Sequence, residues 1–335
     1  MSQEIIKSPT QDGTPGQLAN HYAAQSVFSD YQQRIADNTK RRQQDDLQLF
    51  SQFLANAGMQ ITGENFYQTP EAWSGITYGL VEAFVRWQLQ QGYAIGSINV
   101  RLATIKKYCA LAAKAGSLPV EEIALIRLVQ GFRHKEGRNT DEGRERTRVG
   151  RKKAEAVIIS FDQAQQLKQQ PDTSQGRRDA FLMCLLLDHG LRCGEIAELP
   201  TGAINIQAGT LTFYRRKVDK VQTHELTRDT LIAAARYFDR CTPETYLLLG
   251  SRKGGQLQGR MSERAITDLA RVLCERIGIK GVSAHDGRHA WATFAVRGGT
   301  DLKTLQDAGG WNSIAMPSRY AASQKIANKG VVLGK

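Results

Sequence analysis

A stretch of almost purely polar residues interrupts the chain near its middle and constrains the fold most strongly. Residues 135–156 (KEGRNTDEGRERTRVGRKKAEA) carry many charges and very few apolar side chains. Such a segment cannot contribute to a hydrophobic core and is typical of a linker. We therefore expect two domains, which is also the usual number for a chain of 335 residues.

The part that precedes this linker predicts an arm followed by a small helical domain. Residues 1–26 are polar and contain proline and glycine, which favours a flexible N-terminal arm. Residues 27–134 place apolar side chains at helical spacing, as in Leu47, Phe50 and Leu54. Several of these segments end at a glycine, a frequent helix stop. We expect a small all-helical domain here.

The part that follows the linker, residues 157–335, predicts helices around one β-hairpin. Thr210–Lys217 is rich in β-forming residues, and Val221–Thr227 can pair with it across a turn at residues 218–220. Helical patterns lie on both sides of this hairpin. The expected fold class is therefore mainly α with a small antiparallel β-sheet.

The charge of the chain indicates a polyanionic partner. Lys and Arg number 45 against 33 Asp and Glu, a net charge of +12, and such a surplus is typical of nucleic-acid-binding proteins. Taken singly, each cation on a helix is more simply explained as part of a solvated face. As a set they could follow DNA phosphates. The candidates are Lys40, Arg41, Arg42, Arg101, Lys106, Lys107, Arg151, Lys152 and Lys153.

Other features predict neither a cofactor nor a metal. The five cysteines are scattered and form no C-x-x-C pair, so neither a zinc site nor a disulfide framework is indicated. All histidines except His285 lack metal-ligand spacing and are interpreted as structural. His289, which follows Arg288 directly, could alternatively orient that arginine. No signal sequence or membrane-spanning run is evident, which predicts a cytoplasmic protein.

Two clusters in the second half carry arginines suited to binding a phosphate. In HGLRCGEIAEL, Glu195 follows Arg192 by three positions and can hold its guanidinium by an ion pair. In HDGRH, the i,i+3 spacing of His285 and Arg288 puts both on one helix face. Arginine offers a planar pair of donors to an oxyanion, and histidine can move a proton near neutral pH.

A third cluster, DAGGWNSIAMPSRY, ends in a candidate nucleophile. Trp311 follows two glycines, and Tyr320 comes nine residues later. Tyrosine ionises only near about pH 10, but neighbouring guanidiniums are expected to make its anion easier to form. Attack on phosphorus would then give a covalent phosphotyrosine that conserves the bond energy for rejoining.

The order and spacing of these motifs resemble the tyrosine recombinase (integrase) family. The resemblance rests on GLRCGEI, YRRKVDK, HDGRH and GGW with Tyr320, and covers roughly residues 157–325. The helical first half looks like the family's core-binding (SAM-like) domain. The resemblance implies that this domain and a catalytic domain form a clamp around DNA.

The resemblance implies a role for most of the motif residues. Arg192 and Arg288 would hold the scissile phosphate, with Glu195 orienting Arg192. Tyr320 would be the nucleophile, and His285 would help to remove its proton or hydrogen-bond the phosphate.

Two further positions complete the implied site. Lys217 would protonate the leaving 5′ oxygen, because it is expected at the end of the first hairpin strand. Lys220, expected in the turn, is the alternative. Trp311 can donate a hydrogen bond to the phosphate but cannot shuttle a proton. The family's chemistry needs neither a metal nor a nucleotide.

The implied function is site-specific recombination through a 3′-phosphotyrosyl intermediate and a Holliday junction. Double-stranded DNA carrying a recombination site would be the partner, bound by a homotetramer. The apolar residues Val331, Val332 and Leu333 lie at the chain end. The resemblance implies that such a tail docks on a neighbouring subunit, with exchange of C-terminal tails between subunits; a tail folded back on its own domain is the alternative. Two other functions remain open, a type IB DNA topoisomerase and a catalytically inactive DNA-binding protein of the same fold.

Overall fold

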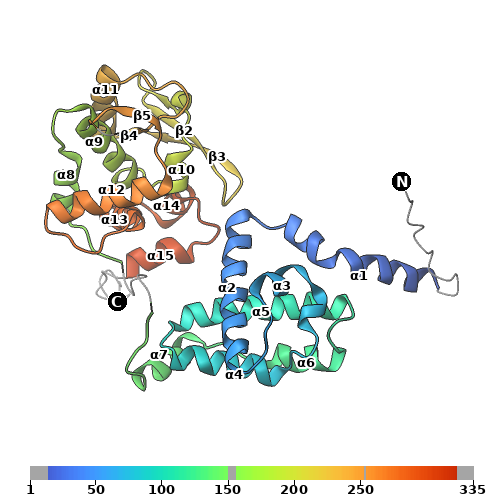
Figure 1. Ribbon diagram of the computed structural model, residues 1–335. Helices are drawn as coiled ribbons and strands as arrows, with labels where there is room; N and C mark the ends of the chain where they lie inside the picture. Colours follow the sequence, from blue (N-terminus) through green and yellow to red (C-terminus); the bar gives the residue numbers. More distant parts are fainter. Residues whose placement is uncertain (1–13, 150–155, 253, 323–335) are drawn as a thin grey trace, which may run out of the picture. The chain divides into compact units, whose positions relative to one another are not determined.

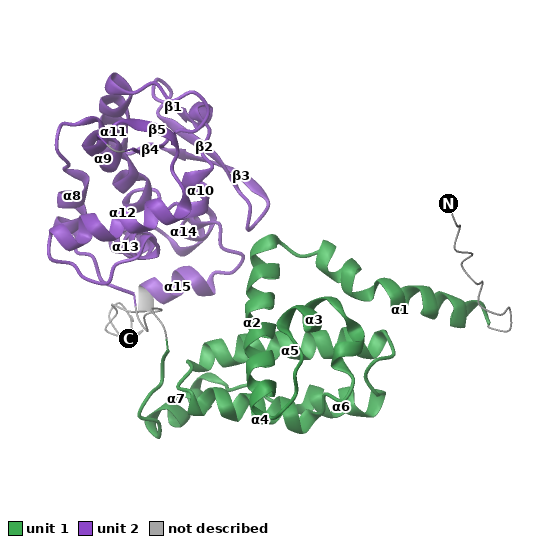
Figure 2. Ribbon diagram, viewed as in Figure 1, with its two compact units in different colours: residues 1–152 green, residues 153–335 purple. Residues whose placement is uncertain are grey.

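The computed structural model describes residues 14–149, 156–252 and 254–322. The chain divides into two compact units, Met1–Lys152 and Lys153–Lys335, which are coloured separately in Figure 2. The division falls inside the segment 135–156 that the sequence marks as polar. Among the described residues, no helix is both long enough and apolar enough to cross a membrane.

Unit 1 is built from helices (Figure 1). Its core is rich in buried aromatic side chains. Trp73 is fully buried, and its ring centroid lies 6.0, 4.9 and 6.0 Å from those of Phe50, Phe66 and Tyr108. Its indole Nε1 donates to the Phe66 carbonyl at 2.9 Å, which satisfies the one polar atom of the ring. The elements are α1 (Pro15–Gln33), α2 (Asp37–Asn56), α3 (Gly63–Gln68), η1 (Pro70–Trp73), α4 (Tyr78–Gln90), α5 (Ile95–Lys114), α6 (Val120–Leu128) and α7 (His134–Glu142).

Helix α1 begins well inside the segment predicted to be a flexible arm. Thr14 accepts a hydrogen bond from the Gln17 backbone, and the Gln17 side chain accepts one from the Thr14 backbone at 2.8 Å. This capping box, with Pro15 at the first helical position, starts a helix efficiently. The prediction of an arm over residues 1–26 is therefore wrong from Pro15 onward. Residues 1–13 lie outside the described part of the chain.

The predicted linker also begins with ordered structure. Helix α7 occupies residues that were expected to be a tether. Just after it, the Arg144 guanidinium donates to the carbonyls of Leu89 and Tyr93 at 3.2 and 3.1 Å. A charged side chain thus binds the segment to unit 1 through backbone acceptors, which an apolar pattern cannot reveal.

Unit 2 surrounds the buried helix α9 and contains two small antiparallel sheets, with strand orders β1-β2-β3 and β4-β5. Every residue from Phe181 to Leu187 on α9 is buried, so this helix forms the centre of the unit's core. The expected fold class, mainly α with a small antiparallel sheet, is confirmed. The elements are α8 (Phe161–Lys168), α9 (Ser174–Leu187), α10 (Cys193–Ala197), η2 (Thr201–Ala203), β1 (Ile204–Asn205), β2 (Thr210–Arg215), β3 (Lys220–Glu225), α11 (Arg228–Arg240), β4 (Leu249–Ser251), β5 (Leu257–Arg260), α12 (Glu263–Arg276), α13 (Ala284–Arg297), α14 (Leu302–Gly309) and α15 (Ala315–Ala322).

The β2–β3 hairpin is shorter than the sequence predicted. Strand β2 ends at Arg215, which pairs with Lys220 at the start of β3. Lys217 therefore lies in the turn and Lys220 in a strand, the reverse of the prediction. The turn is tight enough to place Asp219 in the left-handed region (φ 50°), where its carboxylate accepts a 2.5 Å hydrogen bond from the Tyr214 hydroxyl.

Candidate active site

The first motif folds as a sharp turn into α10. Gly190 has a φ of 59°, and a Cβ there would lie 2.3 Å from the Trp291 ring, so both conformation and space require glycine. Arg192 then caps α10, donating from its backbone N–H to Glu195 Oε2 at 2.8 Å and from Nη1 to Oε1 at 2.7 Å. The ion pair expected from the i,i+3 spacing is confirmed.

Arg288, on α13, is almost completely buried against the first motif. Its Nη1 donates to the Gly190 carbonyl at 2.6 Å, its Nη2 donates to the Gly309 carbonyl, and its guanidinium lies 4.5 Å from the centre of the Trp311 ring. Burial, with the nearby charges of Arg192 and other groups, lowers the pKa of Arg288 to about 9. The side chain therefore stays cationic at neutral pH, and further N–H groups of its guanidinium can still bind an oxyanion.

The two glycines before Trp311 are required by their neighbours. A Cβ on Gly309 would lie 2.1 Å from the Trp311 ring. Gly310 is left-handed (φ 58°), and a Cβ there would approach Arg215 Cδ to 2.5 Å. The GGW motif thus lets the chain leave α14 abruptly and place the indole against Arg288.

Tyr320 projects from α15 into the same cluster and is only 7% exposed. Its ring lies 5.8 Å from that of Trp311 and 5.2 Å from that of His289. Together with His289 and Met316 it lines a cleft of about 360 Å³. The largely buried Tyr320 side chain therefore borders an open cleft.

The pKa of Tyr320 is raised, contrary to the expectation from its neighbours. Burial raises the pKa, and the charges of Arg288, Arg319 and Arg192 oppose this without overcoming it. In this state of the protein the tyrosine is therefore protonated at neutral pH, and a base has to remove its proton.

The histidines of α13 can serve that need. His285 is exposed in part, yet burial, followed by the charges of His289 and Arg288, lowers its pKa, which keeps the imidazole neutral at pH 7. The His285 ring contacts the His289 ring at 4.8 Å. His289, which sequence reasoning took as structural, is the histidine that lies against Tyr320. Its i+1 position after Arg288 gave no sign of this contact.

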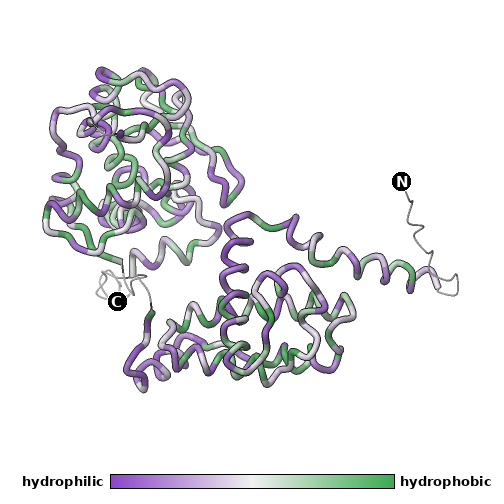
Figure 3. The backbone as a smooth tube through the Cα atoms, viewed as in Figure 1, coloured by the Kyte–Doolittle hydropathy of each residue, from purple (hydrophilic) through white to green (hydrophobic). Residues whose placement is uncertain are grey.

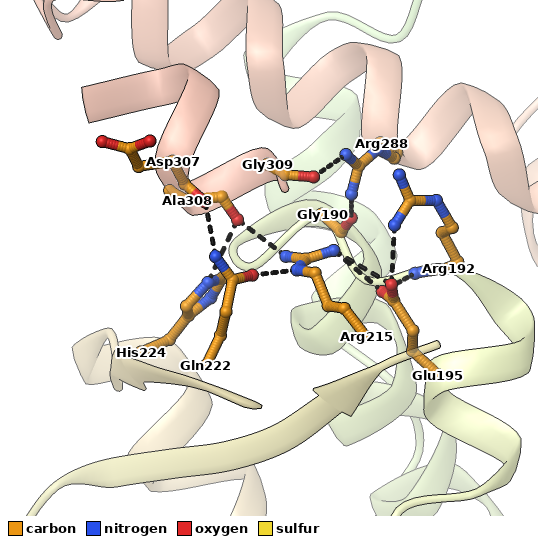
Figure 4. A network of polar contacts seen from close by, with 10 residues as sticks. All are labelled: Gly190, Arg192, Glu195, Arg215, Gln222, His224, Arg288, Asp307, Ala308 and Gly309. Atoms are coloured by element: carbon orange, nitrogen blue, oxygen red, sulfur yellow. Dashed lines mark hydrogen bonds and ion pairs between the residues drawn. The ribbon is translucent and has the colours of Figure 1, made fainter. Parts of the chain in front are cut away.

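Sequence reasoning also missed Arg215, which lies within YRRKVDK but was assigned no role. Its side chain is completely buried, and Nη1 donates to the two Glu195 oxygens at 3.1 and 3.0 Å. Figure 4 shows it at the centre of a polar network that includes Arg192 and Arg288. The candidate acids Lys217 and Lys220 are by contrast exposed on the hairpin.

The basic residues proposed for unit 1 differ in the contacts that they make. Arg42 and Arg101 converge from α2 and α5 on Asp46, with N–O distances of 2.5 and 3.9 Å. Lys106 instead donates to the carbonyls of Arg127 (at 2.9 Å) and Val129, where it satisfies acceptors at the end of α6. Lys106 therefore has a structural role and is a poor candidate for contacting DNA.

The other predicted cations of unit 1 lie on α2 and α5 and make contacts close by. The hydrophilic first half of α2 (Figure 3) carries Lys40 and Arg41, which contact Asp37 and Asn38 one turn away at 3.1 and 2.6 Å. Lys107 lies exposed, 4.5 Å from the centre of the Tyr31 ring. The predicted contacts at 151–153 lie outside the described residues. Within the described part of the chain, no group of three or more His, Cys, Asp or Glu could hold a metal ion.

Comparison with known proteins agrees with this arrangement. The phage integrase family matches residues 158–326, about half of the chain. The protein therefore belongs to this family, that of the tyrosine recombinases. Among curated relatives, the tyrosine recombinase XerD of Neisseria meningitidis serogroup B is 28% identical over 183 residues. The match covers 52% of this chain and 62% of that relative, so the chain spans less than two thirds of its length.

Solved structures extend the likeness of fold to both units. The Tn1549 transposon integrase in complex with transposon right end DNA superposes with a TM-score of 0.64 at 12% identity, covering 91% of this chain and 96% of that one. A lambda integrase dimer bound to a COC′ core site gives 0.60 at 14% identity, covering 93% and 98%. At these identities the likeness concerns the fold.

Proposed function

We propose that this protein is a site-specific DNA recombinase in which Tyr320 cuts and rejoins DNA strands. The observation that carries the proposal is the enclosure of Tyr320 beside Trp311 and Arg288, with Arg192 close enough to act on its pKa. A tyrosine placed among fixed guanidiniums is suited to attack a phosphodiester. Membership of the tyrosine recombinase family supports this chemistry.

The reaction is a reversible transfer of one phosphoryl group. The Tyr320 oxygen attacks phosphorus, the bond to the 5′ oxygen breaks, and a 3′-phosphotyrosyl link forms. Arg192 and Arg288 stabilise the charge that builds on the non-bridging oxygens, a contribution worth roughly a hundred- to a thousandfold in rate per donor. Attack by a 5′ hydroxyl from the partner strand reverses the step and gives a Holliday junction, with no nucleotide or metal needed.

Two proton transfers accompany this step. His285 accepts the Tyr320 proton directly or through His289, which contacts both rings. Lys217 donates a proton to the leaving 5′ oxygen. Its place in the exposed turn suits a residue that reaches a substrate rather than the protein interior, although Lys220 lies only three positions away.

Duplex DNA carrying a recombination site is the proposed partner of both units. In unit 1 the phosphate contacts come from Lys40, Arg41, Arg42, Arg101 and Lys107. The clamp around DNA, the homotetramer and the exchange of C-terminal tails are part of this proposal. The tail residues Val331–Leu333 lie outside the described part of the chain.

Covalent trapping on DNA tests the proposal. Wild-type protein and Tyr320→Phe are mixed with fragmented source DNA and with plasmid, in the presence of chelator, and adducts that survive SDS are isolated. We expect adducts with wild type at one recurring sequence and none with Tyr320→Phe. Adducts spread over all sequences with plasmid relaxation would favour a type IB topoisomerase. Tight binding without adducts would favour a non-catalytic DNA-binding protein.

The identity of the general acid can be tested on the recovered site. Replacing the leaving 5′ oxygen by sulfur gives a thiolate, which leaves without protonation because thiols are far more acidic than alcohols. The general-acid variant should lose activity on normal DNA and regain it on this substrate. We expect Lys217→Met to show that rescue and Lys220→Met to behave similarly on both substrates; the opposite pattern would assign the role to Lys220.

A further inference from the structure

A completely buried arginine ends the first strand of the hairpin and has no assigned role. We propose that Arg215 is a positioning residue for strand cleavage, which fixes Arg192 through Glu195 and fixes Trp311 through the end of α14. The proposal rests on the recombinase function proposed above. It is carried by the contacts of one guanidinium with three separate parts of unit 2 (Figure 4).

The first contact is a carboxylate shared by two guanidiniums. Glu195, 7% exposed, accepts from Arg192 Nη1 at 2.7 Å and from Arg215 Nη1 at 3.0 and 3.1 Å. A glutamate bound only to Arg192 could follow that flexible side chain. Bound also to a buried group, it becomes a fixed anchor. The cluster of Arg192, Glu195 and Arg215 also keeps a net positive charge, as a phosphate site requires.

The second contact caps α14 from the hairpin. A helix leaves its last carbonyl groups without intrahelical partners. Here Arg215 Nη2 donates to the Ala308 carbonyl at 2.7 Å, and His224 contacts the same oxygen at 3.2 Å. Gln222, whose Oε1 accepts from Arg215 Nε, donates to the Asp307 carbonyl at 2.5 Å.

The next carbonyl in this row accepts a hydrogen bond from Arg288, the second arginine proposed to hold the phosphate. Gly309, which follows Ala308, accepts from Arg288 Nη2. Arg215 also packs against the backbone of Gly310, where a Cβ would approach its Cδ to 2.5 Å. The position from which Trp311 reaches Arg288 is thus fixed from one side by Arg288 and from the other by Arg215.

The third part is the hairpin itself, where Arg215 Nε donates to Gln222 on β3. Arg215 is the last residue of β2, two positions before Lys217. Its neighbour Arg216 pairs with Glu198 at 2.7 Å, but that pair is exposed, with 76% of the Arg216 side chain accessible. Because exposed pairs contribute little, the buried contacts of Arg215 hold the base of the turn that carries Lys217.

These contacts depend on the shape of the guanidinium. Nε, Nη1 and Nη2 donate to Gln222, Glu195 and Ala308 respectively, in three directions within one plane. A lysine ammonium offers a single point of charge and cannot span these acceptors. Arg215→Lys should therefore restore part of the function of a neutral variant, but not all of it.

The test compares Arg215→Met, Arg215→Lys and the adjacent control Arg216→Met on the DNA site recovered by trapping. We expect Arg215→Met to slow adduct formation at saturating DNA by roughly 10- to 100-fold, less than the loss of a direct donor. The half-saturating DNA concentration should change less than about threefold, because the phosphate contacts in unit 1 are intact. Arg216→Met should stay within about twofold of wild type on both measures.

A double-mutant cycle separates positioning from general destabilisation. If Arg215 acts through Glu195, combining Arg215→Met with Glu195→Gln should cost little more than the worse single substitution. Hydrogen exchange measured on the same proteins should show faster exchange at residues 305–311 in Arg215→Met. Should that variant fail to fold, Arg215→Lys serves for the same cycle.

Two results would overturn the proposal while leaving the recombinase function intact. One is wild-type cleavage by Arg215→Met. The other is a fully additive cycle with Glu195→Gln. Absence of adducts with the wild-type protein would instead remove the proposed function, and with it the reaction for which Arg215 is proposed.

Discussion

The aromatic core of unit 1 and the polar cluster of unit 2 are both enclosed, but they are held together by different forces. Trp73 and Phe50 are fully buried among other rings and gain stability by leaving water. Arg215 and Arg288 are equally buried, at 0% and 1% exposure. Their burial costs desolvation energy that ion pairs and hydrogen bonds do little more than offset.

This difference indicates what each region contributes. An apolar core tolerates changes of side chain as long as volume is kept, since its contacts have no direction. A buried polar cluster is useful only in one arrangement, since each donor has to meet its acceptor. Substitutions in unit 1 should therefore reduce stability first, and substitutions in the cluster should reduce the reaction rate more than they reduce stability.

The largest effect on stability is expected in the aromatic core. Trp73→Ala removes a fully buried ring and should lower the free energy of unfolding of unit 1 by about 3–5 kcal/mol. Hydrogen exchange resolved by peptide would measure this within unit 1. Val120→Ala, at a position 72% exposed in the same unit, is the control and should change little. Equal losses for both variants would refute the account of this core.

The largest effect on rate is expected at Arg288. Arg288→Lys keeps the charge but not the planar donors, and should slow adduct formation by roughly 100- to 1000-fold, or about 3–4 kcal/mol. Rates at saturating DNA would be compared with those of Arg264→Lys, whose parent side chain is 91% exposed on α12. A loss explained entirely by unfolding would contradict the distinction between the two regions.

A smaller effect should follow from filling the space beside Trp311. Gly309→Ala forces a Cβ against the indole and should destabilise unit 2 by about 1–3 kcal/mol while also slowing cleavage. Gly202→Ala, where a Cβ would meet nothing within 4 Å, provides the matched control. Denaturant titration followed by adduct assays would show whether rate and stability fall together. Unchanged values for Gly309→Ala would mean that Trp311 is not held as described.

The last predicted effect is a pH dependence of stability that comes from two histidines. Burial is the main cause that lowers the pKa of His189 and of His224 to about 4, from 6.5. The folded protein therefore binds fewer protons than the unfolded chain between these values. The stability these groups provide is present above pH 6.5 and is lost as the pH falls toward 4, at no more than about 1.4 kcal/mol per pH unit for each histidine.

Denaturant titrations of unit 2 at pH 7, 6 and 5 would measure this slope. His189→Gln retains a group that can meet the Thr230 hydroxyl, which His189 Nε2 contacts at 3.0 Å, but it cannot titrate. The variant should show a flatter dependence than wild type. An unchanged slope would mean that His189 does not contribute to it.

The sequence predicted those parts of the molecule whose signals are local. Apolar spacing around Leu47 and Phe50 predicted the helix that supports the unit 1 core, and the i,i+3 spacing predicted the pairing of Arg192 with Glu195. The start of α1 was also encoded locally, in Thr14, Pro15 and Gln17, but the surrounding polar residues led to the prediction of a flexible arm.

Other features depend on contacts that no local pattern contains. Arg215 meets the Ala308 carbonyl 93 residues away, so its burial could not be inferred from a hairpin rich in basic residues. The same holds for Arg144, whose acceptors lie more than 50 positions earlier. The pKa of Tyr320 was expected to fall because its charged neighbours were foreseen, whereas the extent of its burial was not.

The central claim is that the Tyr320 oxygen becomes bonded to DNA phosphorus, and peptide mass spectrometry tests it most directly. Adducts trapped with wild-type protein would be digested with nuclease and then with trypsin, and the residue that retains a nucleotide would be identified. The account predicts the nucleotide on Tyr320, in a peptide from the region after Arg319. A nucleotide on another residue, with Tyr320 unmodified, would contradict the account.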